Sequence, residues 1–348
     1  MMPLRNLLYL LQLEEYDLKR FNDWLKNNPD RIVFEKKKHI DWTLKARILW
    51  ALANIFNVFT FGNGPMAIKI VLRFLLPFYI LVKKILVSIA RIKISQMNNL
   101  TIIGITGSYG KTTTKDAISH VLIHKYRTLK TEGNYNTPMG IAKTILRNLL
   151  KNHEIFVCEM AAYQTGDIKT ISKLIKPKIG IITAIGPVHL ERFGSEENIL
   201  KTKLELIESL PESGVCFLPK ELEPKIKNFN IKSKIEFFSS KEELLVKVGK
   251  IFEMPEDEIL GYLKTAPPTP HRQQIIKTSA GITIIDDAYN SNPAGFNSAL
   301  ELLKNTPAQI RILVTPGMIE LGKKQFELNK EAARSATQVA DYVIIVGE

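Results

Sequence analysis

The residues with the clearest chemical signature form the segment GITGSYGKTTTKDAI, residues 104–118. It follows an apolar run and opens a helical stretch, which is the setting that a phosphate-binding loop requires. Gly107 and Gly110 allow backbone N–H groups to turn toward phosphate oxygens, and Lys111 supplies a cation for the β- and γ-phosphates. The segment therefore predicts an ATP-binding loop.

Two oxygen ligands for Mg²⁺ lie in or near this motif. The Thr112 hydroxyl follows the loop lysine directly, and Glu159 stands at the end of an expected apolar strand, in the run IFVCEM at residues 155–160. Hydroxyl and carboxylate oxygens are the ligands that Mg²⁺ takes beside nucleotide phosphates. A strict Walker A motif would have glycine where this chain has Ile105, so the match is to a shorter G-x-x-G-K-T variant.

The elements that must position these residues are apolar runs alternating with helical stretches. We expect strands at residues 100–105, 155–160 and 179–185, and helices at 111–124 and 167–175. Later in the chain we expect a helical stretch at 241–264 and strands within 281–293, 311–317 and 342–348. This alternation predicts βαβ units and a mostly parallel sheet, so the expected fold class is α/β.

Composition and cysteine usage place the chain among globular proteins. Its 348 residues suggest two or three domains, and its hydrophobic content of 45% and charged content of 24% argue against a largely disordered chain. Cys158 and Cys216 cannot form a disulfide framework or a four-thiolate zinc site. Both stand in apolar runs, which predicts buried, reduced thiols and a protein that faces the cytosol.

Positive charge is concentrated at the N-terminal end. Residues 1–98 hold 16 Lys and Arg against 7 Asp and Glu, which is +9 of the formal net charge of +13. No acidic residue occurs from Trp42 to Lys115, and the same stretch is the most apolar part of the chain. A basic, acid-free and aliphatic segment suits an anionic membrane surface better than nucleic acid.

Within this segment the pattern predicts two short helices in a hairpin. The apolar runs 48–61 and 66–94 are separated by GNGP, and Pro77 is expected to kink the second. On a helical wheel the cations of the second run share one face, as in a basic helix lying at a membrane interface; they are Lys69, Arg73, Lys83, Lys84 and Arg91. A buried helical pair in a soluble domain is the alternative, and whether the helices cross the bilayer stays open.

Seven blocks of sequence resemble, in order, those of the Mur ligases of peptidoglycan synthesis. They are GITGSYGKTTT, EGNYNTPMGIAKTIL, CEMAAYQTGDI, ITAIGPVHLERFGSEENILKTKLELI, PHRQQI, GITIIDDAYNSNP and TPGMIELGKKQFELN. The resemblance covers residues 98–348. The NYN and DDAYNSNP blocks are most similar to the members that add D-alanyl-D-alanine.

The resemblance implies roles for further residues. The ATP contacts that it implies are Gly107, Ser108, Tyr109, Gly110, Lys111, Thr112, Thr113, Arg272, Asp287, Tyr289 and Asn290. The catalytic residues that it implies are Lys111, Glu159, His189 and Lys203. His189 and a carbamylated Lys203 would bind a second Mg²⁺, with Lys201 as a less favoured register alternative. Asn134, Tyr135 and Asn136 would contact the substrate.

The expected domain organisation departs from this family at both ends. Residues 1–97 form a helical, basic, membrane-associated segment in place of the family's UDP-binding domain. Residues 98–278 form the ATP-binding central domain, and residues 279–348 a partial, Rossmann-like C-terminal domain. We expect the chain to be associated with the cytoplasmic face of the bacterial inner membrane and to be a shorter version of a complete ligase.

The function that the resemblance implies is an ATP-dependent amide-bond ligase. The acceptor would be a muramoyl-tripeptide-type peptidoglycan precursor, activated as an acyl phosphate, and the amine would be D-Ala-D-Ala. The alternatives are another Mur-type ligase, folylpolyglutamate- or cyanophycin-like, and an inactive membrane-tethered nucleotide-binding scaffold. Nucleic acid is not expected as a partner, because residues 99–348 carry a net charge of only +4.

Overall fold

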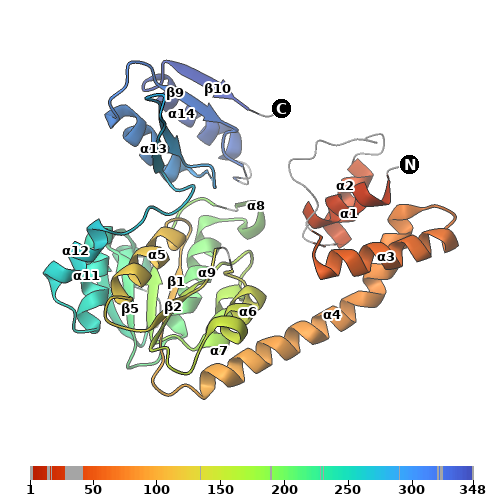
Figure 1. Ribbon diagram of the computed structural model, residues 1–348, viewed down its shortest axis with the longest axis horizontal. Coiled ribbons are helices and arrows are strands. Elements are labelled where there is room, and N and C mark those ends of the chain that lie inside the picture. The colour runs from red at the N-terminus through yellow and green to blue at the C-terminus, as the bar shows by residue number, and fades with distance from the viewer. Residues whose placement is uncertain are drawn as a thin grey trace. The chain divides into compact units, whose positions relative to one another are not determined.

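The chain divides into two compact units in a computed structural model. One comprises Met1–Ile85 and the other Leu86–Glu348. The residues whose structure is described are 3–13, 16, 18–27, 42–133, 135–188, 190–227, 229, 231–289, 291–319, 321 and 324–346. Helix α4 (Gly64–Ser95) runs without interruption across the division between the units (Figure 1).

The elements described in the first unit are helices. They are α1 (Leu4–Leu13), α2 (Leu18–Asn27), α3 (Leu44–Phe59) and the beginning of α4. The Thr43 hydroxyl caps α3 by accepting from the Ala46 N–H, at 3.2 Å. The core of the unit is formed by buried side chains of α1 to α4, among them Leu7, Leu11, Phe21, Leu49 and Ile68.

The expected hairpin of two short helices is wrong in length. The break at GNGP separates α3 from α4 as predicted, but α4 is 32 residues long and continues through Pro77. Proline has no backbone N–H, so Pro77 removes one hydrogen bond from the helix, but α4 continues beyond it. Among the described residues, no helix is long and apolar enough to cross a membrane.

The second unit is built on a six-stranded sheet with the order β2-β3-β1-β4-β5-β6. Its strands are β1 (Thr101–Thr106), β2 (Thr128–Lys130), β3 (Ile155–Glu159), β4 (Ile179–Ile182), β5 (Val215–Pro219) and β6 (Lys234–Phe238). Every pairing is parallel, which confirms the predicted α/β class. The carboxyl ends of β3, β1 and β4 therefore lie side by side, at the edge where parallel sheets bind ligands.

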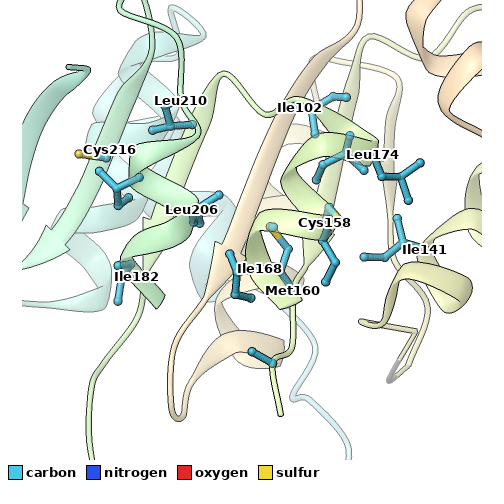
Figure 2. Close-up of a cluster of buried hydrophobic side chains, with 14 of the residues drawn as sticks. Ile102, Ile141, Cys158, Met160, Ile168, Leu174, Ile182, Leu206, Leu210 and Cys216 are labelled. Atoms are coloured by element: carbon cyan, nitrogen blue, oxygen red, sulfur yellow. The ribbon is translucent and has the colours of Figure 1, made fainter. Parts of the chain in front are cut away.

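Helices cover both faces of this sheet, because successive strand residues point to opposite sides. Ile103 packs in the cluster beneath α5 (Lys111–Leu122), α11 (Lys241–Ile251) and α12 (Glu256–Lys264). Its neighbour Ile102 packs in the opposite cluster, with α6 (Pro138–Asn148), α7 (Asp167–Ile175) and α9 (Glu196–Glu208). Figure 2 shows the second cluster, with Ile102, Cys158 and Leu206 together. Cys158 and Cys216 are buried free thiols, as predicted.

The last turns of α4 belong to the second unit. Ala90 and Ile94 are buried in the same cluster as α6 and α7. Lys93 Nζ donates to the carbonyls of Ile145 at 2.8 Å and Leu146 at 3.2 Å, near the end of α6. A cation is favourable there, because the final carbonyls of a helix lack intrahelical partners.

Several elements differ from the sequence prediction. Strand β6 was not predicted from the sequence; Ile235 and Phe237 pack in the cluster on one face of the sheet, and Phe238 packs in the cluster on the other face. The helical stretch 241–264 is two helices, separated by a turn in which Glu253 has a φ of 51°. The remaining short helices are α8 (Leu190–Phe193), η1 (Lys220–Leu222) and α10 (Glu223–Ile226).

The C-terminal residues form two small sheets. Strands β7 (Gln274–Lys277) and β8 (Thr283–Asp286) are antiparallel, and β9 (Ile312–Thr315) pairs in parallel with β10 (Tyr342–Ile345). Helices α13 (Pro293–Asn305) and α14 (Gln325–Thr337) complete this part. Its small core includes Phe296, Leu300, Met318, Leu321 and Ala336.

Candidate active site

The loop between β1 and α5 requires glycine at two positions. Gly110 has a φ of 80°, in the left-handed region that glycine enters without strain. A Cβ at Gly107 would lie 2.1 Å from Thr183 Oγ1, which leaves no room for any side chain. The predicted phosphate loop is thus a tight turn packed against the residue that follows β4.

Hydrogen bonds to the segment after β4 fix the shape of this loop. The Ser108 N–H donates to the Ala184 carbonyl at 2.8 Å, and Ser108 Oγ donates to the Gly186 carbonyl at 3.0 Å. Thr183 Oγ1 donates to the Tyr109 carbonyl at 2.5 Å. With these contacts made, the loop is held before any ligand is bound, which lowers the cost of ordering it around phosphates.

Lys111 stands at the start of α5 and folds back over the loop. Its Nζ donates to the carbonyls of Gly107 at 2.8 Å and Ser108 at 3.3 Å. Enclosure of the ammonium group lowers the pKa of Lys111, although the side chain as a whole is half-buried. Thr112 and Thr113 follow, half-buried, in the first turn of α5, whose N–H groups and dipole favour an anion.

Glu159 is a buried carboxylate at the carboxyl end of β3, with 3% of its side chain exposed. Its Oε1 accepts a hydrogen bond from Asn136 Nδ2 at 2.9 Å. Among the residues that the structure describes, its Oε2 is buried and has no hydrogen-bond partner. A buried carboxylate oxygen without a donor is costly unless a cation lies against it.

The cation that lies nearest this oxygen is one that the sequence analysis missed. Lys115 Nζ is 3.5 Å from Glu159 Oε2, and it also donates to the Gly133 carbonyl at 3.3 Å. Only 1% of its side chain is exposed. The sequence did contain a signal for Lys115. It stands four residues after Lys111, and residues four apart lie on the same face of a helix, so both lysines could be expected to face the site.

Lys203 is buried in α9, with 3% of the residue exposed. Burial, and then the nearby charge of Lys111, lower the pKa of Lys203 to about 7, while Asp167 and Glu205 act in the opposite direction. The register alternative, Lys201, is 54% exposed and pairs with Glu197 at 2.7 Å. Of the two lysines, only Lys203 has the surroundings of a chemically unusual amine.

The predicted ATP contacts outside the phosphate loop come from the segment around β7 and β8. Arg272 stacks on the Tyr289 ring, 4.1 Å from its centroid, and its charge contributes to the lowered pKa of Lys111. Asp287 accepts from the Gln273 N–H at 3.3 Å, and partial burial raises the pKa of its carboxyl. Asp286 instead accepts from His271 at 2.7 Å. The two adjacent carboxylates thus have separate partners.

Three predicted site residues, Asn134, His189 and Asn290, lie outside the described residues. Tyr135 is exposed, and its neighbour Asn136 reaches Glu159. Within the described part of the chain, no cluster of three His, Cys, Asp or Glu side chains could hold a metal. Of the predicted catalytic residues, the structure brings Lys111, Glu159 and Lys203 to one edge of the sheet. Lys115, which was not predicted, lies at the same edge.

Comparison with known proteins gives the family. Residues 105–263 match the Mur ligase middle domain, and residues 271–348 match the Mur ligase glutamate ligase domain. A UDP-N-acetylmuramoyl-tripeptide–D-alanyl-D-alanine ligase of Bacillus subtilis is 33% identical over 271 residues, which cover 66% of this chain and 59% of the relative. The enzyme of the same name from Buchnera aphidicola is 30% identical, with 68% and 61% covered.

Solved structures agree with this result. MurF ligase from Thermotoga maritima, in complex with ADP, matches with a TM-score of 0.68 and 26% identity, over 75% of this chain and 69% of that one. MurF from Acinetobacter baumannii shares the fold, with a TM-score of 0.71 over 76% and 68%. The chain spans about three fifths of the length of the curated relatives that it matches. Over the matched domains, which include the loop at Lys111 and the carboxylate at Glu159, this chain belongs to the Mur ligase family.

Proposed function

We propose that this protein is an ATP-dependent amide-bond ligase that joins D-Ala-D-Ala to a muramoyl-tripeptide-type precursor. The observation that carries the proposal is the Lys111 loop beside the Glu159 carboxylate, one oxygen of which has no donor. The relatives named above are ligases with this substrate pair, and one of the solved relatives is a complex with ADP.

The reaction needs activation because a carboxylate does not condense with an amine in water. In the first step the acceptor carboxylate attacks the γ-phosphorus of ATP, so that an acyl phosphate forms and ADP leaves. In the second step the amine attacks the acyl carbon, inorganic phosphate leaves and the nitrogen loses a proton. Bringing a carboxylate against a triphosphate makes cationic stabilisation the main requirement. Lys111, held at the loop carbonyls, provides one such charge.

The residues present fit Mg²⁺ as a cofactor. Glu159 Oε2 is a buried oxygen without a hydrogen bond, and the Thr112 hydroxyl stands in the first turn of α5. One carboxylate, one hydroxyl and the phosphates are a typical ligand set for Mg²⁺, which retains several waters. Bound there, Mg²⁺ would neutralise the charge that develops on the phosphates. His189 and a carbamylated Lys203 are the proposed ligands of a second ion.

Carbamylation of Lys203 is consistent with the surroundings of this side chain. Only a neutral amine attacks CO₂, and a pKa of about 7 leaves about half of the amine neutral near pH 7. For a lysine with the usual pKa of 10.5, the neutral fraction at that pH would be roughly a thousandfold smaller. The product would be an anion next to the Lys111 ammonium, which is a favourable pairing.

The proposal is tested by ADP release from the full chain with ATP, MgCl₂, a muramoyl-tripeptide acceptor and D-Ala-D-Ala, with mass spectrometry of the product. We expect ADP release that needs both substrates, a pentapeptide product, and loss of turnover in Lys111→Ala. The matched control is Lys143→Ala, which removes an exposed lysine of α6 and should leave turnover unchanged. ADP release with a different acid would assign another Mur-type substrate. Nucleotide binding without ADP release on any acceptor would leave a scaffold and overturn the proposal.

A further inference from the structure

The first unit exposes a large apolar surface on α4. Phe74, Phe78, Leu81 and Ile85 follow one another at spacings of three and four residues, so they lie along one face of the helix. We refer to these four side chains as the α4 stripe. Phe74 is 76% exposed and Phe78 is 66% exposed. A continuous row of solvent-exposed aromatic and aliphatic side chains is typical of a surface that binds a protein, a ligand or a membrane.

Basic residues border this stripe. Arg73 and Lys84 are exposed and lie eleven residues apart, which is three turns and places them on the same face. Between them lies a groove whose other lining residues are apolar, namely Leu76, Pro77, Ile80 and Leu81. Cations therefore stand at both ends of an apolar surface, and no acidic residue occurs from Trp42 to Lys115 to offset them.

The turn between α3 and α4 presents a second apolar surface in the same acid-free region. Val58 and Phe59 end α3 largely exposed, and Phe61 in the turn is 98% exposed. Phe61 also has a φ of 51°, in the left-handed region that a bulky side chain enters only at a cost. The positive φ and the exposure of Phe61 both carry a cost in the folded chain, and Phe61 adds to the exposed apolar surface that Val58 and Phe59 form.

From these features we infer that the α4 stripe and the turn at Phe61 bind the surface of an anionic phospholipid bilayer. Aromatic and branched aliphatic side chains enter the boundary between headgroups and acyl chains, while Arg and Lys remain with the phosphates. The charge argues for lipid over a second copy of the chain. The basic side chains at both ends of the stripe would repel those of a second copy in a symmetric dimer, whereas anionic headgroups would neutralise them.

This inference goes beyond the ligase activity and does not depend on it. The same helix that carries the stripe ends in the core of the second unit, where Ala90 and Ile94 are buried and Lys93 binds the end of α6. Binding of α4 to a bilayer would therefore keep the nucleotide-binding domain at the membrane.

The test is flotation of the full chain with two kinds of vesicles, one of phosphatidylcholine alone and one with about 30% phosphatidylglycerol. We expect binding to the anionic vesicles at least about tenfold above the neutral ones, and release when NaCl is raised from about 0.1 to 0.5 M. Arg73→Gln with Lys84→Gln should remove most of the anionic preference. The control pair, Lys143→Gln with Lys173→Gln, removes the same charge from α6 and α7 and should bind as the wild type does.

Two apolar variants separate insertion from simple charge attraction. Phe74→Asn, Phe78→Asn and Leu81→Asn together should lower binding about tenfold or more. Phe61→Asn should also lower it and cannot unfold the protein by loss of packing, since Phe61 is 98% exposed and asparagine tolerates its φ. The control triple variant replaces loop residues of similar exposure, namely Leu150→Asn, Ile282→Asn and Ile310→Asn.

Three results would overturn the inference. The first is that the wild type floats equally well with neutral and with anionic vesicles. The second is that both apolar variants bind the anionic vesicles as the wild type does. The third is that the wild type is a dimer without lipid in sedimentation velocity and that the triple variant Phe74→Asn, Phe78→Asn, Leu81→Asn is a monomer. The last result would assign the stripe to a second copy of the chain. ATP-dependent thermal stabilisation of each variant checks that its nucleotide-binding domain is folded.

Discussion

Lys115 Nζ lies 3.5 Å from Glu159 Oε2, and 1% and 3% of the two side chains are exposed. Asn136 donates to the other carboxylate oxygen, whereas Oε2 faces the ammonium group and accepts no hydrogen bond from the residues that the structure describes. The attraction between the two buried charges offsets part of the cost of removing both from water, although the lone pairs of Oε2 are not satisfied by hydrogen bonds. Lys115 therefore acts as the resident counter-cation of the carboxylate proposed to bind Mg²⁺.

The first prediction concerns this pair. Lys115→Met leaves the Glu159 charge buried and unpaired, so the free energy of unfolding without Mg²⁺ should fall by about 3–5 kcal/mol in urea titrations. The double variant Lys115→Met, Glu159→Gln removes both charges and should recover most of that loss. MgCl₂ with ATP should stabilise Lys115→Met more than the wild type. Equal losses in the single and double variants would show that the two groups do not interact.

The second prediction is a pH dependence of stability caused by Lys203. Its pKa is about 7 in the folded protein against 10.5 ordinarily, so the unfolded chain binds the additional proton between these values and stability rises with pH across that window. Below about pH 7 the amine is charged in both states and the full cost of burial remains. In CO₂-free buffer, Lys203→Met should therefore raise the melting temperature by a few degrees at pH 6 and by less at pH 10. Lys201→Met, on the exposed side of α9, should not reproduce this pattern.

The third prediction tests carbamylation. Lys203→Ala should lose most ADP release, and acetate or propionate should restore part of it, because a small carboxylate can occupy the space and carry the charge of the carbamate. Lys201→Ala is the control and should need no rescue. The wild type incubated with ¹³C-bicarbonate should show a carbamate carbon by NMR that is missing from Lys203→Ala. No carbamate signal and no rescue would contradict the assignment.

The fourth prediction concerns the loop that holds Asn136. A Cβ at Gly140 would lie 2.9 Å from the Cα of Tyr135 and 3.1 Å from its carbonyl carbon, so Gly140→Ala must displace this backbone. We expect a loss of about 1–3 kcal/mol in unfolding free energy and weaker acceptor binding, because Asn136 would be moved from Glu159. Gly261→Ala in α12 meets open space and should instead stabilise by about 0.5–1 kcal/mol. Equal effects of the two substitutions would show that the space around Gly140 does not matter.

The α/β class and the phosphate loop follow from the order and type of the residues alone. Alternating apolar and helical segments specify a parallel sheet, because strands buried on both faces need helices on each side. The glycines, lysine and threonine at residues 107–112 carry their chemistry in residue type and spacing. The sequence also identified Glu159 correctly as a strand-end residue, since the apolar run before it was long enough to recognise.

Which charged side chains come into contact depends on how the strands and helices pack. Lys115 looked like any helix lysine, and its importance appears when β3 pairs with β1 and brings Glu159 beside α5. Lys201 and Lys203 could not be separated by spacing, whereas packing exposes one and buries the other. Strand β6 forms in a charged segment because the edge of the sheet offers it a partner in β5. Burial, pairing and the resulting pKa of a side chain depend on residues distant in sequence, so the local pattern does not contain them.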